Sequence, residues 1–238
     1  MQFFSYLING ISLGSVYALI ALGYTMVYGI AKMLNFAHGD VIMIGSYVVY
    51  FAFGASGLNP VLSIVLSMIV CTILGVVIER LAYRPLREAP SLAVLITAIG
   101  VSYLLQQVAQ LSWSSNPKSF TSVVSGMKPV SLFGGQLTIS AETIVTIVAC
   151  VVIMVVLMWF VNYTPAGHAM LAVSEDRGAA QLMGVNVNGT ISLTFAIGSA
   201  LAAIAGALLC SSYPTLQPTT GAMPGIKAFV AAVFGGIG

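Results

Sequence analysis

The chain has 238 residues, of which 59% are hydrophobic and only 6% are charged, and its formal net charge is +2. Soluble domains carry roughly 25% charged residues, so this composition excludes a water-soluble protein. A small net charge without a Lys/Arg-rich cluster also argues against nucleic acid as a partner. Because the apolar runs are ~20 residues long rather than ~10-residue alternating segments, we expect an all-α polytopic membrane protein surrounded by lipid.

The positions of the nine prolines divide the chain into spans, since proline disrupts the interior of a helix. Between them the sequence predicts membrane-spanning helices near residues 3–30, 36–54, 60–81, 91–112, 139–161 and 190–212. A further apolar run from about Gly225 reaches Gly238 after ~14 residues, fewer than the ~17–25 that cross a bilayer. We therefore expect about seven or more transmembrane helices in a single domain over 1–238, truncated at its C-terminus; a re-entrant last segment is the alternative.

Lysine and arginine predict the orientation, because short loops rich in these residues stay in the cytoplasm. The segment 79–90 carries three arginines, whereas the longer segment 113–138 carries two lysines. This bias places 79–90 and, two spans later, 163–188 in the cytoplasm. The segment 113–138 and the N-terminus then lie outside.

Small residues predict close packing of the helices, because glycine and alanine let helix backbones approach one another in lipid. The first span contains Gly10-x-x-x-Gly14, and the sixth contains Gly198, Ala202, Ala205 and Gly206. These faces indicate bundling within the chain or a surface for a second membrane chain, and the sequence leaves both open.

The segment 163–188 is about 26 residues long, although ~2–8 residues suffice to connect two helices. It contains the adjacent charges of Glu175, Asp176 and Arg177. A single helix over 167–184 would place small side chains near one face and turn the two carboxylates away; that face comprises Ala172, Ala179, Ala180 and Met183. Asp176 could cap a helix by accepting a hydrogen bond from the N–H of Ala179. We interpret the segment as a docking element rather than a solvated connector.

A second polar group, Asn35, His38, Gly39 and Asp40, lies at the start of the second span. Polar residues at membrane depth are candidates for function. In the functional interpretation Gly39 breaks the helix, and its neighbours line a translocation path. In the structural alternative Asp40 stabilises a helix N-terminus at the membrane edge and pairs with Lys32. A metal site is not expected from one histidine and one aspartate.

The remaining polar residues of the spans allow simpler interpretations. Glu79 beside Arg80 is expected to form an interfacial ion pair, and Glu142 is expected at the outer membrane edge. Four residues of the fourth span could line a pathway or form hydrogen bonds between helices; they are Thr97, Ser102, Gln106 and Gln107. None of these residues forms a pattern that predicts catalysis.

Three stretches carry a resemblance to a known family. They are "YALIALGYTMVYGIAKMLNFAHGDVIMIGSYV", "IERLAYRPLREAPSLAVLITAIGVSYLL" and "AMLAVSEDRGAAQLMGVNVNGTISLTFAIGSALAAIAGAL". Together they resemble the branched-chain amino acid ABC importer permeases of the LivH type, and the likeness extends over most of the chain. The first stretch and the E-D-R-x-A-A-x-x-x-G block are its most specific parts.

The resemblance implies a type II ABC importer-like permease in the bacterial inner membrane, without enzymatic activity of its own. It further implies a heterodimer with a second, related permease, two cytoplasmic ATPase subunits that hold ATP and magnesium, and a periplasmic substrate-binding protein. The loop at 163–188 would be the coupling loop that contacts an ATPase. The residues carried over to that contact are Glu175, Asp176, Arg177, Ala179, Ala180 and Gly184.

Two alternatives remain open at the level of sequence. Permeases for urea, short amides or other amino acids are closely similar, so the resemblance leaves the solute open. A secondary transporter that works without an ATPase would require ionisable residues deep in several spans, and this chain has almost none.

Overall fold

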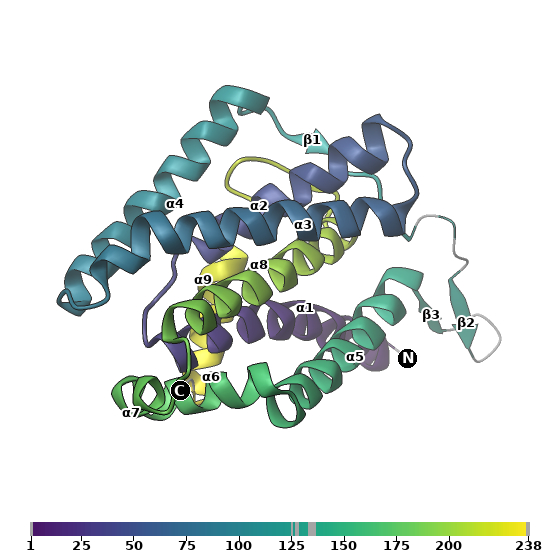
Figure 1. The fold of residues 1–238 in the computed structure, drawn as a ribbon. Helices are drawn as coiled ribbons and strands as arrows, with labels where there is room; N and C mark the ends of the chain where they lie inside the picture. The colour runs from purple at the N-terminus through teal and green to yellow at the C-terminus, as the bar shows by residue number, and fades with distance from the viewer. Residues whose placement is uncertain (1, 125, 127–128, 133–136, 237–238) are drawn as a thin grey trace.

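The computed structural model describes residues 2–124, 126, 129–132 and 137–236, which fold mainly into helices (Figure 1). The α-helices are α1 Gln2–Ala31, α2 His38–Val49, α3 Pro60–Ile78, α4 Ser91–Trp113, α5 Ala141–Tyr163, α6 Pro165–Glu175, α7 Arg177–Leu182, α8 Val187–Ser212 and α9 Ala222–Phe234. The π-helices η1 Tyr50–Ala55 and η2 Glu79–Tyr83 continue α2 and α3, and the 3-10 helix η3 Arg84–Leu86 follows. Within the described ranges, four short strands form two antiparallel pairs, β1 Lys118–Ser119 with β4 Thr215–Leu216 and β2 Val130–Leu132 with β3 Leu137–Ile139.

Polar side chains cap the starts of α3, α5, α6 and α8, and a fifth cap is described below with α7. Asn59, Ser140, Thr164 and Asn186 each accept a hydrogen bond from a backbone N–H in the first turn of α3, α5, α6 and α8. These first-turn N–H groups have no partner within the helix, so the caps stabilise the helix starts. Pro60 occupies the first position of α3, where the lack of an N–H removes no hydrogen bond.

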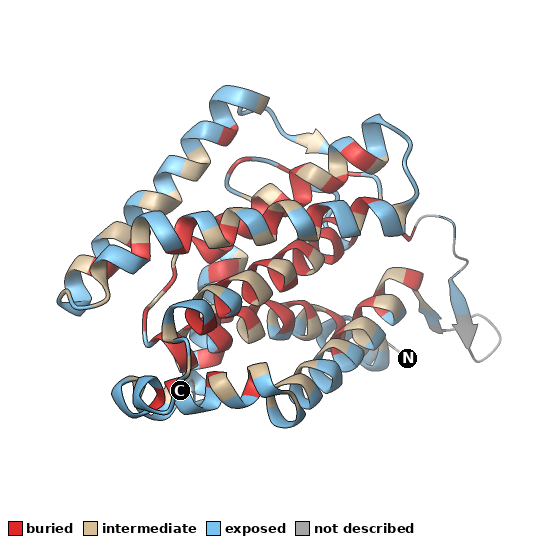
Figure 2. Cartoon of the chain, in the orientation of Figure 1, coloured by how far each residue is buried: buried red, intermediate tan, exposed pale blue. Residues whose placement is uncertain are grey.

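Helix α8 lies at the centre of the molecule. It packs against α1, α2 and α3, while α5 covers the outer side of α1 (Figure 1). Figure 2 shows the consequence for burial: α8 and α2 are mostly buried, whereas α4 and α5 expose apolar surface along most of their length. An exposed apolar helix face is what lipid-facing segments require.

Close packing around α8 depends on small residues. A Cβ on Gly45 would lie 2.9 Å from the Cα of Ala203, and a Cβ on Gly206 would lie 2.6 Å from the carbonyl oxygen of Ile42. The α8 small-residue face therefore packs inside its own chain. Gly10 and Gly14 differ, because a Cβ on either would meet no atom within 4 Å among the described residues.

Five described helices are long and apolar enough to cross a membrane: α1, α3 with its continuation to Leu86, α4, α5 and α8. The segment predicted as a span over 36–54 forms α2 and its direct continuation η1, and α2 is almost entirely buried among the other helices. Helix α9, at 13 residues, is a shorter apolar helix. The structure thus contains five candidate spans where the sequence predicted six and a further apolar run.

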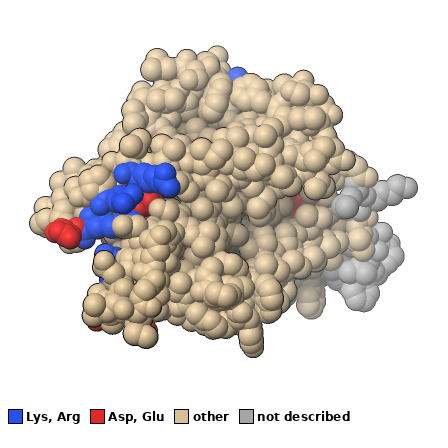
Figure 3. Space-filling model, viewed as in Figure 1, with Lys and Arg blue, Asp and Glu red and all other residues tan. Residues whose placement is uncertain are grey.

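The two ends of the helix bundle differ in the number of basic side chains that they carry (Figure 3). One end carries α6, α7 and η3 and is called the α7 end; the other carries β2 and β3 and is called the β2–β3 end (Figure 1). In Figure 3 the lysine and arginine side chains gather at the α7 end, and a single basic side chain is visible at the top of that view.

Candidate functional site

The segment between α5 and α8 is a helical elbow rather than the single helix predicted over 167–184. The break falls at Asp176, whose backbone is extended, with φ −150° and ψ 113°. Its Oδ1 accepts hydrogen bonds from the N–H groups of Gly178 at 2.7 Å and Ala179 at 3.0 Å. The predicted cap to Ala179 is therefore confirmed, and it also explains the break: an aspartate that caps a new helix cannot continue the preceding one.

Gly184 ends the elbow. Its φ is +86°, a conformation that costs little only for glycine. The N–H of Gly184 donates to the carbonyl of Gln181 at 3.0 Å, and the N–H of Val185 donates to that of Ala180 at 3.0 Å. This pair of hydrogen bonds is the Schellman arrangement that closes the C-terminus of a helix. The sharp exit expected at Gly184 is thus present.

The outward face of the elbow is apolar. Leu182 is 90% exposed and Met183 is 84% exposed. Ala180, which the single-helix prediction placed on the same face as Met183, is only 4% exposed and packs into the molecule. Ala172 and Ala179 are exposed, as are Glu175 and Asp176.

Arg177 connects the elbow to α1. Its guanidinium donates a hydrogen bond to the carbonyl oxygen of Ala31, the last residue of α1. A cation is favoured there, because the final carbonyls of a helix have no partner within the helix and carry partial negative charge. Burial, and secondarily the nearby Arg87, lower the pKa of Arg177 below its ordinary value. The side chain predicted to face a partner thus contacts its own chain.

A buried polar cluster lies beside this contact. The carboxylate of Glu79 is 0% exposed and forms an ion pair with Arg87, which is 11% exposed. Its second oxygen accepts a hydrogen bond from Ser192 at 2.6 Å, and Arg87 also donates to the side chain of Asn188. The predicted interfacial pair of Glu79 with Arg80 was wrong, since the ion-pair partner in the structure is Arg87, eight residues away. The cluster joins η2, the loop before α4 and the start of α8.

The polar group at the start of α2 lies inside the helix bundle. Asn35 accepts a hydrogen bond from the hydroxyl of Tyr83 at 2.9 Å, and Asp40 accepts one from Gln106 at 2.9 Å. The ring of His38 packs against that of Tyr24 with centroids 4.7 Å apart. All the polar members of this group are at most 5% exposed. The expected ion pair of Asp40 with Lys32 is absent among the described residues. Asp40 instead accepts a hydrogen bond from the side-chain amide of Gln106 on α4.

Gly39 does not break a helix. Helix α2 begins one residue earlier, at His38, and continues through Gly39. A Cβ on Gly39 would lie 2.7 Å from the carbonyl oxygen of Gly221, the residue that precedes α9. The glycine therefore permits two helix starts to touch. A role of these residues in translocation stays a prediction.

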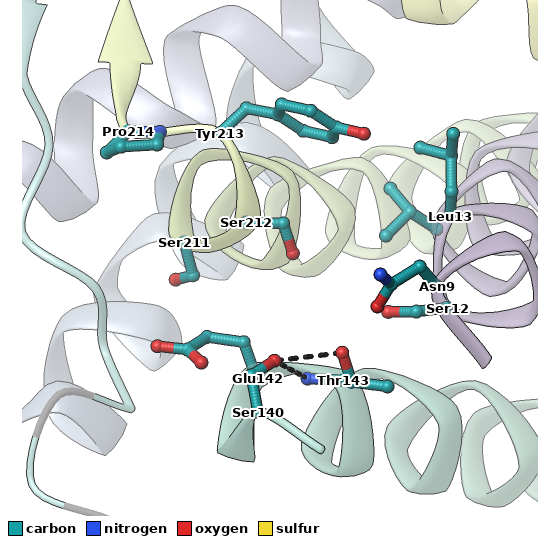
Figure 4. A pocket seen from close by; sticks show the side chains of 11 residues that line it. Asn9, Ser12, Leu13, Ser140, Glu142, Thr143, Ser211, Ser212, Tyr213 and Pro214 are labelled. Carbon is teal, nitrogen blue, oxygen red and sulfur yellow. Dashed lines mark hydrogen bonds between the residues drawn. The ribbon is translucent and has the colours of Figure 1, made fainter. Parts of the chain in front are cut away.

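A cavity of about 500 Å³ opens near the β2–β3 end. It lies between residues 9–16 of α1, residues 140–143 at the start of α5 and residues 211–214 at the end of α8 (Figure 4). Figure 4 shows Glu142 on one side and Asn9 and Ser12 on the opposite side. Sequence reasoning placed Glu142 at a membrane edge but missed the cavity, because its walls come from three distant segments.

Comparison with known proteins places these features in a family. Residues 6–238 match the family described as "Branched-chain amino acid transport system / permease component". No solved structure matches the chain at a significant level.

Several curated proteins are similar over nearly the whole chain. The high-affinity branched-chain amino acid transport system permease protein BraD of Pseudomonas aeruginosa is 44% identical over 98% of this chain and 78% of its own length. LivH of Escherichia coli, which has the same description, is 41% identical over 100% of this chain and 80% of its own length. The ribose import permease protein RbsC of Haemophilus influenzae is 27% identical over 93% of this chain and 66% of its own length.

Proposed function

Because the chain belongs to the branched-chain amino acid transport system permease family, we propose that it is the membrane subunit of an ATP-driven importer for leucine, isoleucine and valine. The observation that carries this proposal is the 41–44% identity to BraD and LivH over nearly the whole chain. Identity to the ribose permease is only 27%, which favours an amino acid over a sugar. The chain forms the path, and the ATP and magnesium are held by partner subunits.

We further place the α7 end in the cytoplasm and the β2–β3 end outside the inner membrane. The concentration of basic side chains at the α7 end supports this orientation (Figure 3), since lysine and arginine are enriched in cytoplasmic loops. It also puts the N-terminus outside, near the β2–β3 end in Figure 1. We infer a single permease domain over 1–238 with the coupling loop at 163–188, in which α2 with η1 and α9 would bring the five candidate spans to at least seven.

The elbow formed by α6 and α7 is the surface that we assign to a cytoplasmic ATPase. Leu182 and Met183 would insert into the ATPase as apolar anchors, because large exposed side chains at a polar surface are typical of interfaces. The exposed carboxylates of Glu175 and Asp176 would orient the contact through charge. Ala179 and Gly184 would allow the two surfaces to approach closely.

Arg177 would transmit force rather than contact the ATPase. Its hydrogen bond to Ala31 joins the elbow to α1, and α1 is followed directly by the buried group at the start of α2. Motion of the elbow would therefore reach Asn35, His38, Gly39 and Asp40 through covalent and hydrogen-bonded connections. The four residues would then act by positioning α2 along the path.

The partners expected are two ATPase subunits, a second related permease and a periplasmic binding protein. The decisive experiment is purification of the tagged chain with its co-expressed partners, followed by reconstitution in liposomes with ATP inside. Leucine uptake that requires ATP and the binding protein supports the proposal. Urea, acetamide and ribose serve as competitors, and uptake of any of these in preference to leucine would reassign the solute. Uptake by the chain alone, driven by an ion gradient, would refute the ATP-driven mechanism.

A further inference from the structure

The cavity near the β2–β3 end has the chemistry of a binding site. Most of its lining residues have polar side chains, although 59% of the residues in the whole chain are hydrophobic. Ser12 is 7% exposed and makes no side-chain hydrogen bond within the described part of the chain, whereas Asn9 and Ser212 are exposed to solvent. Polar groups removed from bulk water are costly unless they have partners. A partner for the Ser12 hydroxyl is therefore expected in the cavity, and Asn9 and Ser212 are free to bind the same ligand.

The electrostatics of the cavity favour a cation. Glu142 is the one charged side chain among its described lining residues. It accepts a hydrogen bond from Ser122 at 3.1 Å, which holds the carboxylate without neutralising it. The C-terminal end of α8 also contributes its partial negative charge through residues 211–213. At the start of α5 the Ser140 cap satisfies the N–H of Thr143, and the partial positive charge of that helix end, roughly +0.5, is smaller than the full negative charge of Glu142.

The opposite wall suits a different group. Asn9 and Ser12 present an amide and a hydroxyl that can donate hydrogen bonds, and Leu13 and Val16 add apolar surface. Figure 4 shows Glu142 across the cavity from Asn9, Ser12 and Leu13. A ligand with an ammonium group, a hydrogen-bond acceptor and an aliphatic chain would satisfy all of these groups at once.

We propose that this cavity is an outer binding site for an aliphatic α-amino acid, in which Glu142 accepts the α-ammonium group. The α-carboxylate accepts hydrogen bonds from Ser12 and Asn9, and the side chain lies against Leu13 and Val16. The site would receive the solute after release from the binding protein. This inference rests on the proposed function, which assigns both the solute and the face of the membrane on which the cavity lies.

The first test measures the charge preference of the cavity without any transport. Ser212→Cys places a thiol on the wall, while the native cysteines Cys71, Cys150 and Cys210 are buried and provide a low background. The thiol is labelled with a cationic and an anionic methanethiosulfonate reagent, and the ratio of the two rates is compared between variants. Glu142→Gln should lower the cation-to-anion ratio at least about fivefold, because a nearby carboxylate attracts one reagent and repels the other. Glu88→Gln, an exposed carboxylate at the α7 end, is the matched control and should leave the ratio unchanged.

The second test identifies the ligand group. Leucine and isoamylamine, which has the ammonium but no carboxylate, should slow the labelling of Ser212→Cys. Isovalerate, which has the carboxylate but no ammonium, should protect weakly or not at all. Glu142→Gln should abolish protection by isoamylamine. Equal protection by isovalerate and isoamylamine, or an unchanged ratio of labelling rates in Glu142→Gln, would overturn the proposal.

Uptake separates this proposal from the proposed function. In the reconstituted complex, Glu142→Gln should raise the KM for leucine about tenfold or more, while Glu88→Gln should not. If the wild type carries leucine and Glu142→Gln does so equally well, the binding site is wrong and the importer function stands. If the wild type carries no branched-chain amino acid, the importer function fails, whatever the labelling shows.

Discussion

The carboxylate of Glu79 is fully buried, and its ion-pair partner is Arg87, not the adjacent Arg80. Two further side chains complete the cluster, because Ser192 donates to Glu79 and Asn188 accepts from Arg87. A buried charge is tolerated only when it is paired and hydrogen-bonded. The cluster therefore locks the start of α8 to the end of α3 at the α7 end.

Removing Arg87 should destabilise the protein strongly. Arg87→Ala leaves the Glu79 carboxylate buried without its partner, and such a loss costs about 3–5 kcal/mol. The expected result is a large fall in the thermal unfolding midpoint in detergent, measured by the fluorescence of a thiol-reactive dye. The double variant Glu79→Gln with Arg87→Ala should recover part of the loss, because no uncompensated charge remains. Equal stability of the single variant and the wild type would contradict the pairing.

Asp176→Ala should weaken the elbow locally. The variant removes the cap that satisfies the N–H groups of Gly178 and Ala179, which costs about 1 kcal/mol. We expect faster hydrogen exchange in α7, measured by mass spectrometry, with little change in α8. Asp176→Asn retains a capping oxygen and is the control. If exchange in Asp176→Asn is as fast as in Asp176→Ala, the negative charge and not the capping oxygen stabilises the start of α7.

A charge on the exposed face of the elbow should block assembly with the ATPase. Leu182→Glu or Met183→Glu places a carboxylate on a side chain that is 90% or 84% exposed, so folding should be unaffected. The amount of ATPase recovered with the tagged permease should fall at least about tenfold, as expected when an apolar side chain that becomes buried in the complex is lost. The control is Gln181→Glu, which adds the same charge at an exposed position of the same short helix. If the contact depends on the apolar side chains of Leu182 and Met183, this control should retain more ATPase than either variant.

Arg177→Met should uncouple ATP hydrolysis from uptake. The variant keeps an apolar side chain of similar length but removes the donor to the carbonyl of Ala31. Because the ATPase would still dock on Leu182 and Met183, we expect hydrolysis with few solute molecules carried per ATP. Measuring ATP hydrolysis and leucine uptake in the same liposomes gives the number of leucine molecules carried per ATP hydrolysed. An unchanged ratio would show that force reaches α1 by another route.

Gly221→Ala should disturb the contact between two helix starts. A Cβ at this position would collide with the carbonyl oxygen of Gly39, and backbone atoms cannot rotate away as a side chain can. Overpacking of this kind costs about 1–3 kcal/mol, which a lower unfolding midpoint would reveal. Gly100→Ala, in α4 with open space around it, should instead be neutral or slightly stabilising.

The cap and the exit of the elbow were predicted correctly from local sequence, whereas the break within it and the distant contacts were not. The cap at Asp176 and the exit at Gly184 depend on hydrogen bonds between residues at most five positions apart, so the local sequence contains the information required. The break between α6 and α7 was missed because a helical apolar pattern continues across Asp176. The side on which a residue is buried is set by the rest of the fold, which is why Ala180 was assigned to the wrong surface.

Pairing across long separations could not be predicted. Glu79 has Arg80 beside it in sequence, yet its real partners come from the loop before α4 and from α8, 113 residues away at Ser192. The same holds for Asp40, whose partner Gln106 lies on α4. A hydrogen bond between helices depends on their rotation and depth, and neither follows from the periodicity of one apolar run.

The contact of Gly39 with Gly221 sets an order of events during synthesis. The two residues are 182 positions apart, and at ~5–20 residues per second the ribosome needs roughly 9–36 seconds to make the intervening chain. During that time the start of α2, with His38 and Asp40, lacks the cover that residues 213–221 and α9 later provide. The nascent chain must therefore hold the start of α2 without this cover until residues 213–234 have been made. Membrane insertion of this permease is a problem of timing as well as of hydrophobicity.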